Sequence, residues 1–122
     1  MSLIKKFGNF FKSDPRKEYL LNLINKQIKL SKDEFDLNIL PKDQYLEREI
    51  IPKIILTYWD QIKTGDYSKL FSRCVREVKL NFEPQLKYYF IKTPPGETRT
   101  RYDCHLESIV AAAFIYISNE RN

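Results

Sequence analysis

The chain has 122 residues, of which 43% are hydrophobic and 14% aromatic, and its formal net charge is +5. This length suits one domain and is short for two, so we expect a single domain over residues 1–122. The composition excludes a disordered tail, and the longest apolar run, residues 109–117, is about half a membrane span.

The first clear helical pattern follows Ser13-Asp14-Pro15, a capping side chain with proline in the first turn. The spacing of the apolar residues then predicts a helix that ends near Leu30, with residues 31–40 as a connection or a short turn of helix. A second apolar pattern covers residues 42–63. Pro52 lies inside it, so we expect either a kink there or two helices that meet there.

Thr64-Gly65-Asp66 predicts the end of one helix and the start of the next, which carries an apolar stripe from Tyr67 to Val78. Residues 86–91 suit either a strand or a short helix after Pro84, and residues 93–98 suit a turn. Residues 99–103 are expected as exposed linker or strand, before a strongly apolar helix over residues 106–117. The predicted fold is therefore mainly α, a single-domain bundle of four to five helices. Its α+β alternative has one short β hairpin around residues 86–103.

The chain has two cysteines, Cys74 and Cys104, which is fewer than a small secreted disulfide framework uses. The first residues lack the continuous apolar region of a signal peptide, so we expect none there. We therefore expect reduced thiols and a cytoplasmic protein, with one disulfide between the two cysteines as the minor alternative.

Charge is arranged in blocks along the chain. Residues 1–17 hold five basic residues and one acidic residue, residues 33–60 hold seven acidic and three basic residues, and residues 61–102 hold nine basic and four acidic residues. Opposed charged surfaces of this kind suit a protein that binds another macromolecule.

Residues 1–12 predict an amphipathic helix, because their large apolar residues share one helical face and their lysines point away. The apolar members are Leu3, Ile4, Phe7, Phe10 and Phe11. We expect this helix to dock on the body of the domain or to contact a partner, and peripheral membrane contact through residues 3–12 is the minor alternative.

The charged blocks supply two sets of candidate binding residues. The predicted protein-binding residues are the acids Asp33, Glu34, Asp36, Asp43 and Glu47, toward a basic partner, and Arg73, Arg76, Arg99 and Arg101, toward an acidic partner. The alternative is a nucleic-acid face of Lys69, Arg73, Arg76, Lys79, Arg99 and Arg101, with Tyr88 or Tyr89 stacked on bases. The plainer interpretation of the basic residues is a solvated helix face.

Residues 99–105 gather the single histidine, His105, with Cys104, but neighbours in sequence point apart on a helix and form no working pair by themselves. The chain shows no phosphate-binding loop, no paired metal-ligand spacing and no nucleophile motif. We therefore expect no catalytic residue, metal or cofactor. The expected function is a non-enzymatic module of the inhibitor, immunity or adaptor kind that binds another protein, and the alternative is a nucleic-acid-binding accessory protein.

Overall fold

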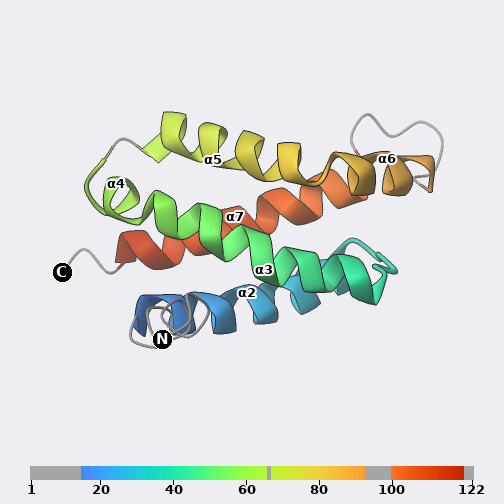
Figure 1. Ribbon diagram of the computed structural model, residues 1–122, viewed down its shortest axis with the longest axis horizontal. Helices are drawn as coiled ribbons and strands as arrows, with labels where there is room; N and C mark the ends of the chain where they lie inside the picture. Colours follow the sequence, from blue (N-terminus) through green and yellow to red (C-terminus); the bar gives the residue numbers. More distant parts are fainter. Residues whose placement is uncertain (1–14, 66, 93–99, 120–122) are drawn as a thin grey trace, which may run out of the picture.

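A computed structural model describes residues 15–65, 67–92 and 100–119, and every regular element within these residues is a helix (Figure 1). In chain order the helices are α2 (Pro15–Glu34), α3 (Pro41–Thr57), α4 (Trp59–Thr64), α5 (Tyr67–Asn81), α6 (Glu83–Ile91) and α7 (Arg101–Asn119). The predicted mainly α fold is confirmed. The helix expected over residues 1–12 and the helix cap expected from Ser13 and Asp66 lie outside the described residues.

Helix α7 is the element around which the others are arranged, and it packs against α2, α3, α4, α5 and α6. In Figure 1 it runs between α5 and α2, with α3 in front of it. Its inner face is apolar and buried along most of its length, and Leu106, Ile109, Val110 and Ala113 on this face are all fully buried. Burying one large aliphatic side chain contributes roughly 1.5–3 kcal/mol, so this one helix supplies a large share of the stabilising apolar contact.

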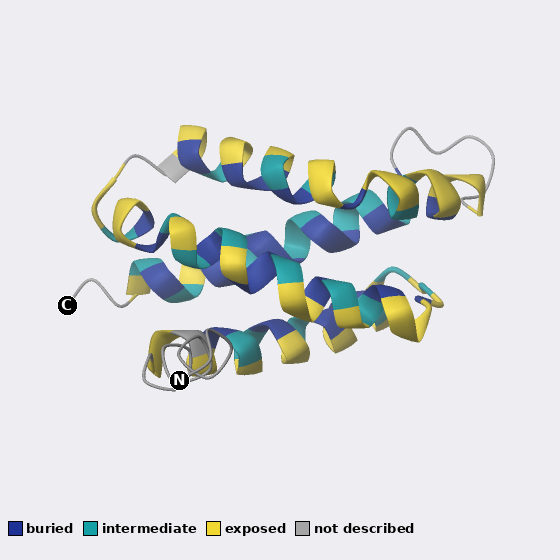
Figure 2. Cartoon of the chain, in the orientation of Figure 1, coloured by how far each residue is buried: buried dark blue, intermediate teal, exposed yellow. Residues whose placement is uncertain are grey.

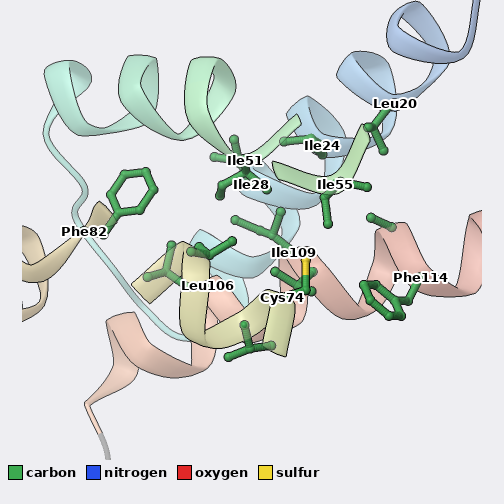
Figure 3. Close-up of a cluster of buried hydrophobic side chains, with 14 of the residues drawn as sticks. Leu20, Ile24, Ile28, Ile51, Ile55, Cys74, Phe82, Leu106, Ile109 and Phe114 are labelled. Carbon is green, nitrogen blue, oxygen red and sulfur yellow. The ribbon is translucent and has the colours of Figure 1, made fainter. Parts of the chain in front are cut away.

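The core is formed where the apolar stripes predicted from the sequence meet α7. Figure 2 shows buried positions along the inward side of each helix, and Figure 3 shows the side chains themselves. The labelled members are Leu20, Ile24 and Ile28 of α2, Ile51 and Ile55 of α3, Cys74 of α5, and Leu106, Ile109 and Phe114 of α7, with Phe82 at the junction of α5 and α6. Among the described helices, none combines the length and the apolar character needed to cross a membrane.

The helix predicted over residues 42–63 is divided at Tyr58, six residues after the proline that signalled a kink or a break. Pro52 is buried inside α3, although it can donate no backbone hydrogen bond there. At Tyr58 the amide donates to the carbonyl of Ile55 at 3.0 Å, and α4, which starts at Trp59, runs in a different direction from α3 (Figure 1). Gly65 caps α4, and a Cβ atom on it would lie 2.6 Å from the carbonyl oxygen of Gln61, so this position has no room for a side chain.

Residues 86–91 are helical and belong to α6, so a strand there is wrong. The expected exposed linker over residues 99–103 is also wrong for its described part, since α7 begins at Arg101 and Tyr102 is fully buried. Thr100 explains the early start, because its Oγ1 atom accepts a hydrogen bond from the Asp103 amide at 2.9 Å and so caps the helix. A single threonine between two arginines is a weak sequence signal for a helix cap, so the start of α7 at Arg101 was not predicted.

Helix α2 extends to Glu34, past the predicted end near Leu30. It finishes in a Schellman arrangement: the Leu37 amide donates to the Lys32 carbonyl at 2.8 Å, and the Asp36 amide donates to the Asp33 carbonyl at 3.2 Å. This closure places Asp36 in the left-handed region, with φ of 52°, a conformation that usually belongs to glycine.

Candidate functional site

Two of the acids predicted to contact a partner, Asp43 and Glu47, lie in the interior. They are one turn apart on the inner face of α3, and their exposed fractions are 3% and 0%. They are therefore not surface residues, and we remove them from the predicted protein-binding set. Burial of an ionised carboxylate is costly without partners, so the question is what pairs with them.

Glu47 is held by two donors from α7. The Tyr102 hydroxyl donates to its Oε2 atom at 2.7 Å, and the Nε2 atom of His105 lies 2.8 Å from its Oε1 atom. Because an ionised carboxylate only accepts hydrogen bonds, the network assigns the Nε2 proton to His105. Both side chains of this pair are fully buried.

The second nitrogen of His105, Nδ1, lies 2.7 Å from the Oγ atom of Ser31 on α2. The Oγ atom of Ser108 lies 2.8 Å both from Ser31 Oγ and from the His105 carbonyl oxygen. With neutral His105, Ser108 donates to Ser31 and Ser31 donates to Nδ1. With protonated His105, Nδ1 donates to Ser31, Ser31 to Ser108, and Ser108 to the carbonyl. The two hydroxyls therefore satisfy either protonation state of the ring by reversing their direction.

Asp43 has its own set of partners from α6. The Tyr89 hydroxyl donates to Oδ2 at 2.7 Å while accepting from the Leu40 amide at 2.9 Å, and Gln85 Nε2 donates to Oδ1 at 3.2 Å. The Tyr89 and Tyr102 rings stack, with centroids 4.5 Å apart. The pKa of each tyrosine is raised, first by loss of water on burial and then by the Asp43 and Glu47 carboxylates beside them.

Ser31, His105 and Glu47 together have the composition of a hydrolase triad, but the serine has no route to a substrate in this structure. Its exposed fraction is 0%, and its hydroxyl is already engaged by His105 and Ser108. Both ring nitrogens of His105 are likewise occupied, so neither is directed at the neighbouring Cys104 thiol. What the cluster does is join α2, α3 and α7 through buried hydrogen bonds.

The remaining predicted acids lie together at the end of α2. Asp33 and Glu34 are exposed in or beside its last turn, and exposed Asp36 follows in the Schellman arrangement. Asp36 also lines a polar pocket of about 290 Å³ with Lys92 and Arg101. Arg101 therefore faces the acidic end of α2, while Arg99 lies outside the described residues.

The predicted basic face over residues 69–101 is divided by the fold. Lys79 forms ion pairs with Asp103 and with Glu107, the latter at 3.0 Å, so its charge is matched within the protein. Tyr89 is buried on Asp43 and cannot stack on a base, whereas Tyr88 is 44% exposed. The basic residues that the fold keeps together lie on one exposed side of α5. They line a hollow of about 400 Å³, which we call the basic hollow. It is lined by Ser68, Lys69, Ser72, Arg73 and Arg76.

A groove between α5, α6 and α7, with a volume of about 440 Å³, adjoins the basic hollow; we call it the α5–α6–α7 groove. Its apolar lining comprises Phe71, Val75, Leu80 and Leu86, and its charged rim comprises Arg76, Lys79, Glu83 and Glu107. Phe90 lies one turn beyond Leu86 on α6 and extends the apolar surface. This groove was not predicted from the sequence. Leu80 could have indicated it, because this leucine lies outside the apolar stripe of its helix and is therefore expected on the surface.

Comparisons of the chain with models of protein families, with curated proteins and with solved structures found no match in any of the three.

Proposed function

We propose that this protein is a non-enzymatic binding module of the inhibitor, immunity or adaptor kind, acting in the cytoplasm on another protein. The observation that carries the proposal is the apolar surface left open along the α5–α6–α7 groove. Leu80 lines the groove and is 61% exposed, and Phe90, one turn beyond Leu86 on α6, is 60% exposed. Exposed apolar surface that is rimmed by charge is typical of protein interaction sites.

The shape of the groove supports a protein ligand. It is bounded by helices, its floor is aliphatic and aromatic, and its rim is charged on both sides. An amphipathic helix binds this type of surface by laying side chains at positions i, i+3, i+4 and i+7 into the floor. The free thiols of Cys74 and Cys104 agree with a reducing compartment.

Affinity capture with matched surface variants tests the proposal. Leu80→Ser/Phe90→Ser removes two exposed apolar side chains at the groove, and Tyr19→Ser/Leu30→Ser removes two of similar exposure, 63% and 53%, from α2. We expect a protein partner that survives nuclease treatment to be retained by the wild type and by the α2 variant, and lost by the groove variant. Equal retention by all three proteins would contradict a role for the groove.

Nucleic-acid binding is the second candidate, and the basic hollow is the observation in its favour. Lys69, Arg73 and Arg76 are exposed on one side of one helix, and the hydroxyls of Ser68 and Ser72 line the same hollow. Basic and hydroxyl side chains are the usual contacts to phosphate. Binding of this kind would weaken steeply with salt, by nearly one unit of log-log slope for each phosphate neutralised.

A further inference from the structure

We infer that the partner presents an acidic amphipathic helix, whose apolar side chains enter the α5–α6–α7 groove while its acidic side chains meet the basic hollow. This inference rests on the protein-binding function proposed above and specifies the chemistry of the partner. The two hollows are lined in common by Ser72 and Arg76. A ligand that fills the groove along α5 therefore lies beside the basic side chains as well.

The apolar part of the surface has the dimensions of a helix interface. Phe71 and Val75 are one turn apart on α5, and Leu80, nine positions after Phe71, lies half a turn further around the helix near its end, where Leu86 of α6 continues the apolar lining. A partner helix lying along this floor would place three or so apolar side chains on it at its own spacing of three or four residues.

The basic part has a matching spacing. Lys69, Arg73 and Arg76 are separated by four and three residues, which corresponds to rises of about 6 Å and 4.5 Å along the axis. Acidic residues on one edge of a second helix repeat at the same intervals, so three ion pairs can form in register. None of the five residues that line this hollow is acidic.

The charges on the two sides of the groove indicate how the partner helix is oriented. Exposed Arg76 is on the α5 side and exposed Glu83 is on the α6 side, whereas Lys79 and Glu107 neutralise each other within the protein. The acidic edge of the partner helix therefore faces α5, and its opposite edge is neutral or basic. A nucleic-acid strand would use the basic hollow alone and leave the apolar floor uncovered, so the combined surface favours a helix.

Fluorescence anisotropy with a defined probe tests this inference. The probe is a rhodamine-labelled helical peptide of about 18 residues, with leucine along one stripe and glutamate beside it, and a second peptide replaces each glutamate by lysine. A thymidine oligonucleotide of about 20 nucleotides represents single-stranded nucleic acid. Each is titrated with wild type, with Arg73→Glu/Arg76→Glu, and with Lys26→Glu/Lys29→Glu. The last variant makes the same charge change at the same spacing on exposed positions of α2.

We expect the glutamate peptide to bind wild type and the α2 variant equally, and to bind the α5 variant roughly tenfold more weakly, since two ion pairs become repulsive. The lysine peptide should show the opposite order. Equal weakening in both variants would mean that only net charge matters, and would overturn the inference. Oligonucleotide binding that depends on Arg73 and Arg76, without peptide binding, would overturn it in favour of nucleic acid. A captured partner that depends on Leu80 and Phe90 but not on Arg73 and Arg76 would leave the proposed function standing while this inference fails.

Discussion

The Nε2 atom of His105 lies 2.8 Å from the Oε1 atom of Glu47, and neither side chain is exposed to solvent. This pair connects α7 to α3 inside the core, and the Tyr102 hydroxyl donates a further hydrogen bond to the carboxylate. A buried polar pair contributes little net stability compared with apolar packing, but removal of one member is costly, because the other is left buried without a partner.

Replacement of Glu47 therefore tests the buried network. We expect Glu47→Ala to lower the free energy of unfolding by about 3–5 kcal/mol, since His105 and Tyr102 both lose their acceptor. The matched control is Glu49→Ala, which removes an exposed carboxylate two residues away on α3 and should change stability by less than about 0.5 kcal/mol. Urea denaturation measures both. Similar midpoints for the two variants would contradict the structural role of the pair.

Alkaline pH should destabilise the protein through Tyr89 and Tyr102. Their pKa values are raised above the ordinary value of 10.0, mainly by burial and further by the Asp43 and Glu47 carboxylates. The folded state then keeps these protons when the unfolded state loses them. The contribution of the two groups is fully present below pH 10 and is lost as the pH rises above it.

For Tyr102 this loss is about 1.4 kcal/mol for each pH unit above 10. Denaturant unfolding at increasing pH should show a shallower loss of stability in Tyr102→Phe than in wild type. Tyr45→Phe, which changes a tyrosine of α3 that is 61% exposed, is the control and should leave the slope unchanged. A native protein in which all tyrosines titrate near pH 10 would be incompatible with this prediction.

The two thiols should differ in reactivity. Cys74 is fully buried in the core, and loss of water raises the pKa of its thiol to about 12, with Glu77 adding to the shift. Its thiolate is therefore scarce at pH 8, and reagents reach it only when the structure opens.

We expect a thiol reagent at pH 8 to modify native Cys104→Ser at least about a hundredfold more slowly than the same variant in denaturant. Native Cys74→Ala, which keeps the partly exposed Cys104, should react faster than native Cys104→Ser. Equal rates for the two native variants would show that Cys74 is accessible.

The Schellman arrangement after α2 makes a prediction about Asp36. With φ of 52° this residue is in a region that glycine occupies without strain and alanine does not. Asp36→Gly and Asp36→Ala both remove the charge, so their difference isolates the backbone. We expect the glycine variant to be more stable than the alanine variant by about 1 kcal/mol in thermal or urea unfolding. An alanine variant as stable as the glycine variant would mean that α2 ends differently.

Local sequence patterns predicted most of the helices, because the residues that a helix buries against its neighbours recur every three or four positions in the sequence. The stripe that includes Cys74 and Val78 lies on the inner face of α5 as expected. The helix break near Tyr58 was not predicted, because Pro52 is the stronger local signal and yet α3 continues through it. The sequence left open whether residues 86–91 form a strand or a helix, because aromatic residues suit both. In the structure they are helical, and Phe82 and Tyr89 pack into the bundle.

The candidate site was harder to predict because charge alone does not indicate exposure. Asp43 and Glu47 belong to an acidic block of the sequence, and their partners Tyr89, Tyr102 and His105 lie between 46 and 58 residues further along the chain. No local pattern signals such pairs. Lys79 is similar, since only the fold brings it to Asp103 and Glu107.

The central position of α7 also affects how the protein is made. Helices α2 to α6 each pack on residues 101–119, so during translation they emerge from the ribosome before the segment that completes their core. The parts of their apolar faces that pack on α7 stay uncovered until then, because contacts between α2 and α7 join positions far apart in the chain. We therefore expect nascent chains that stop before Arg101 to remain sensitive to protease, and protection to appear only once the whole of α7 has left the ribosomal tunnel.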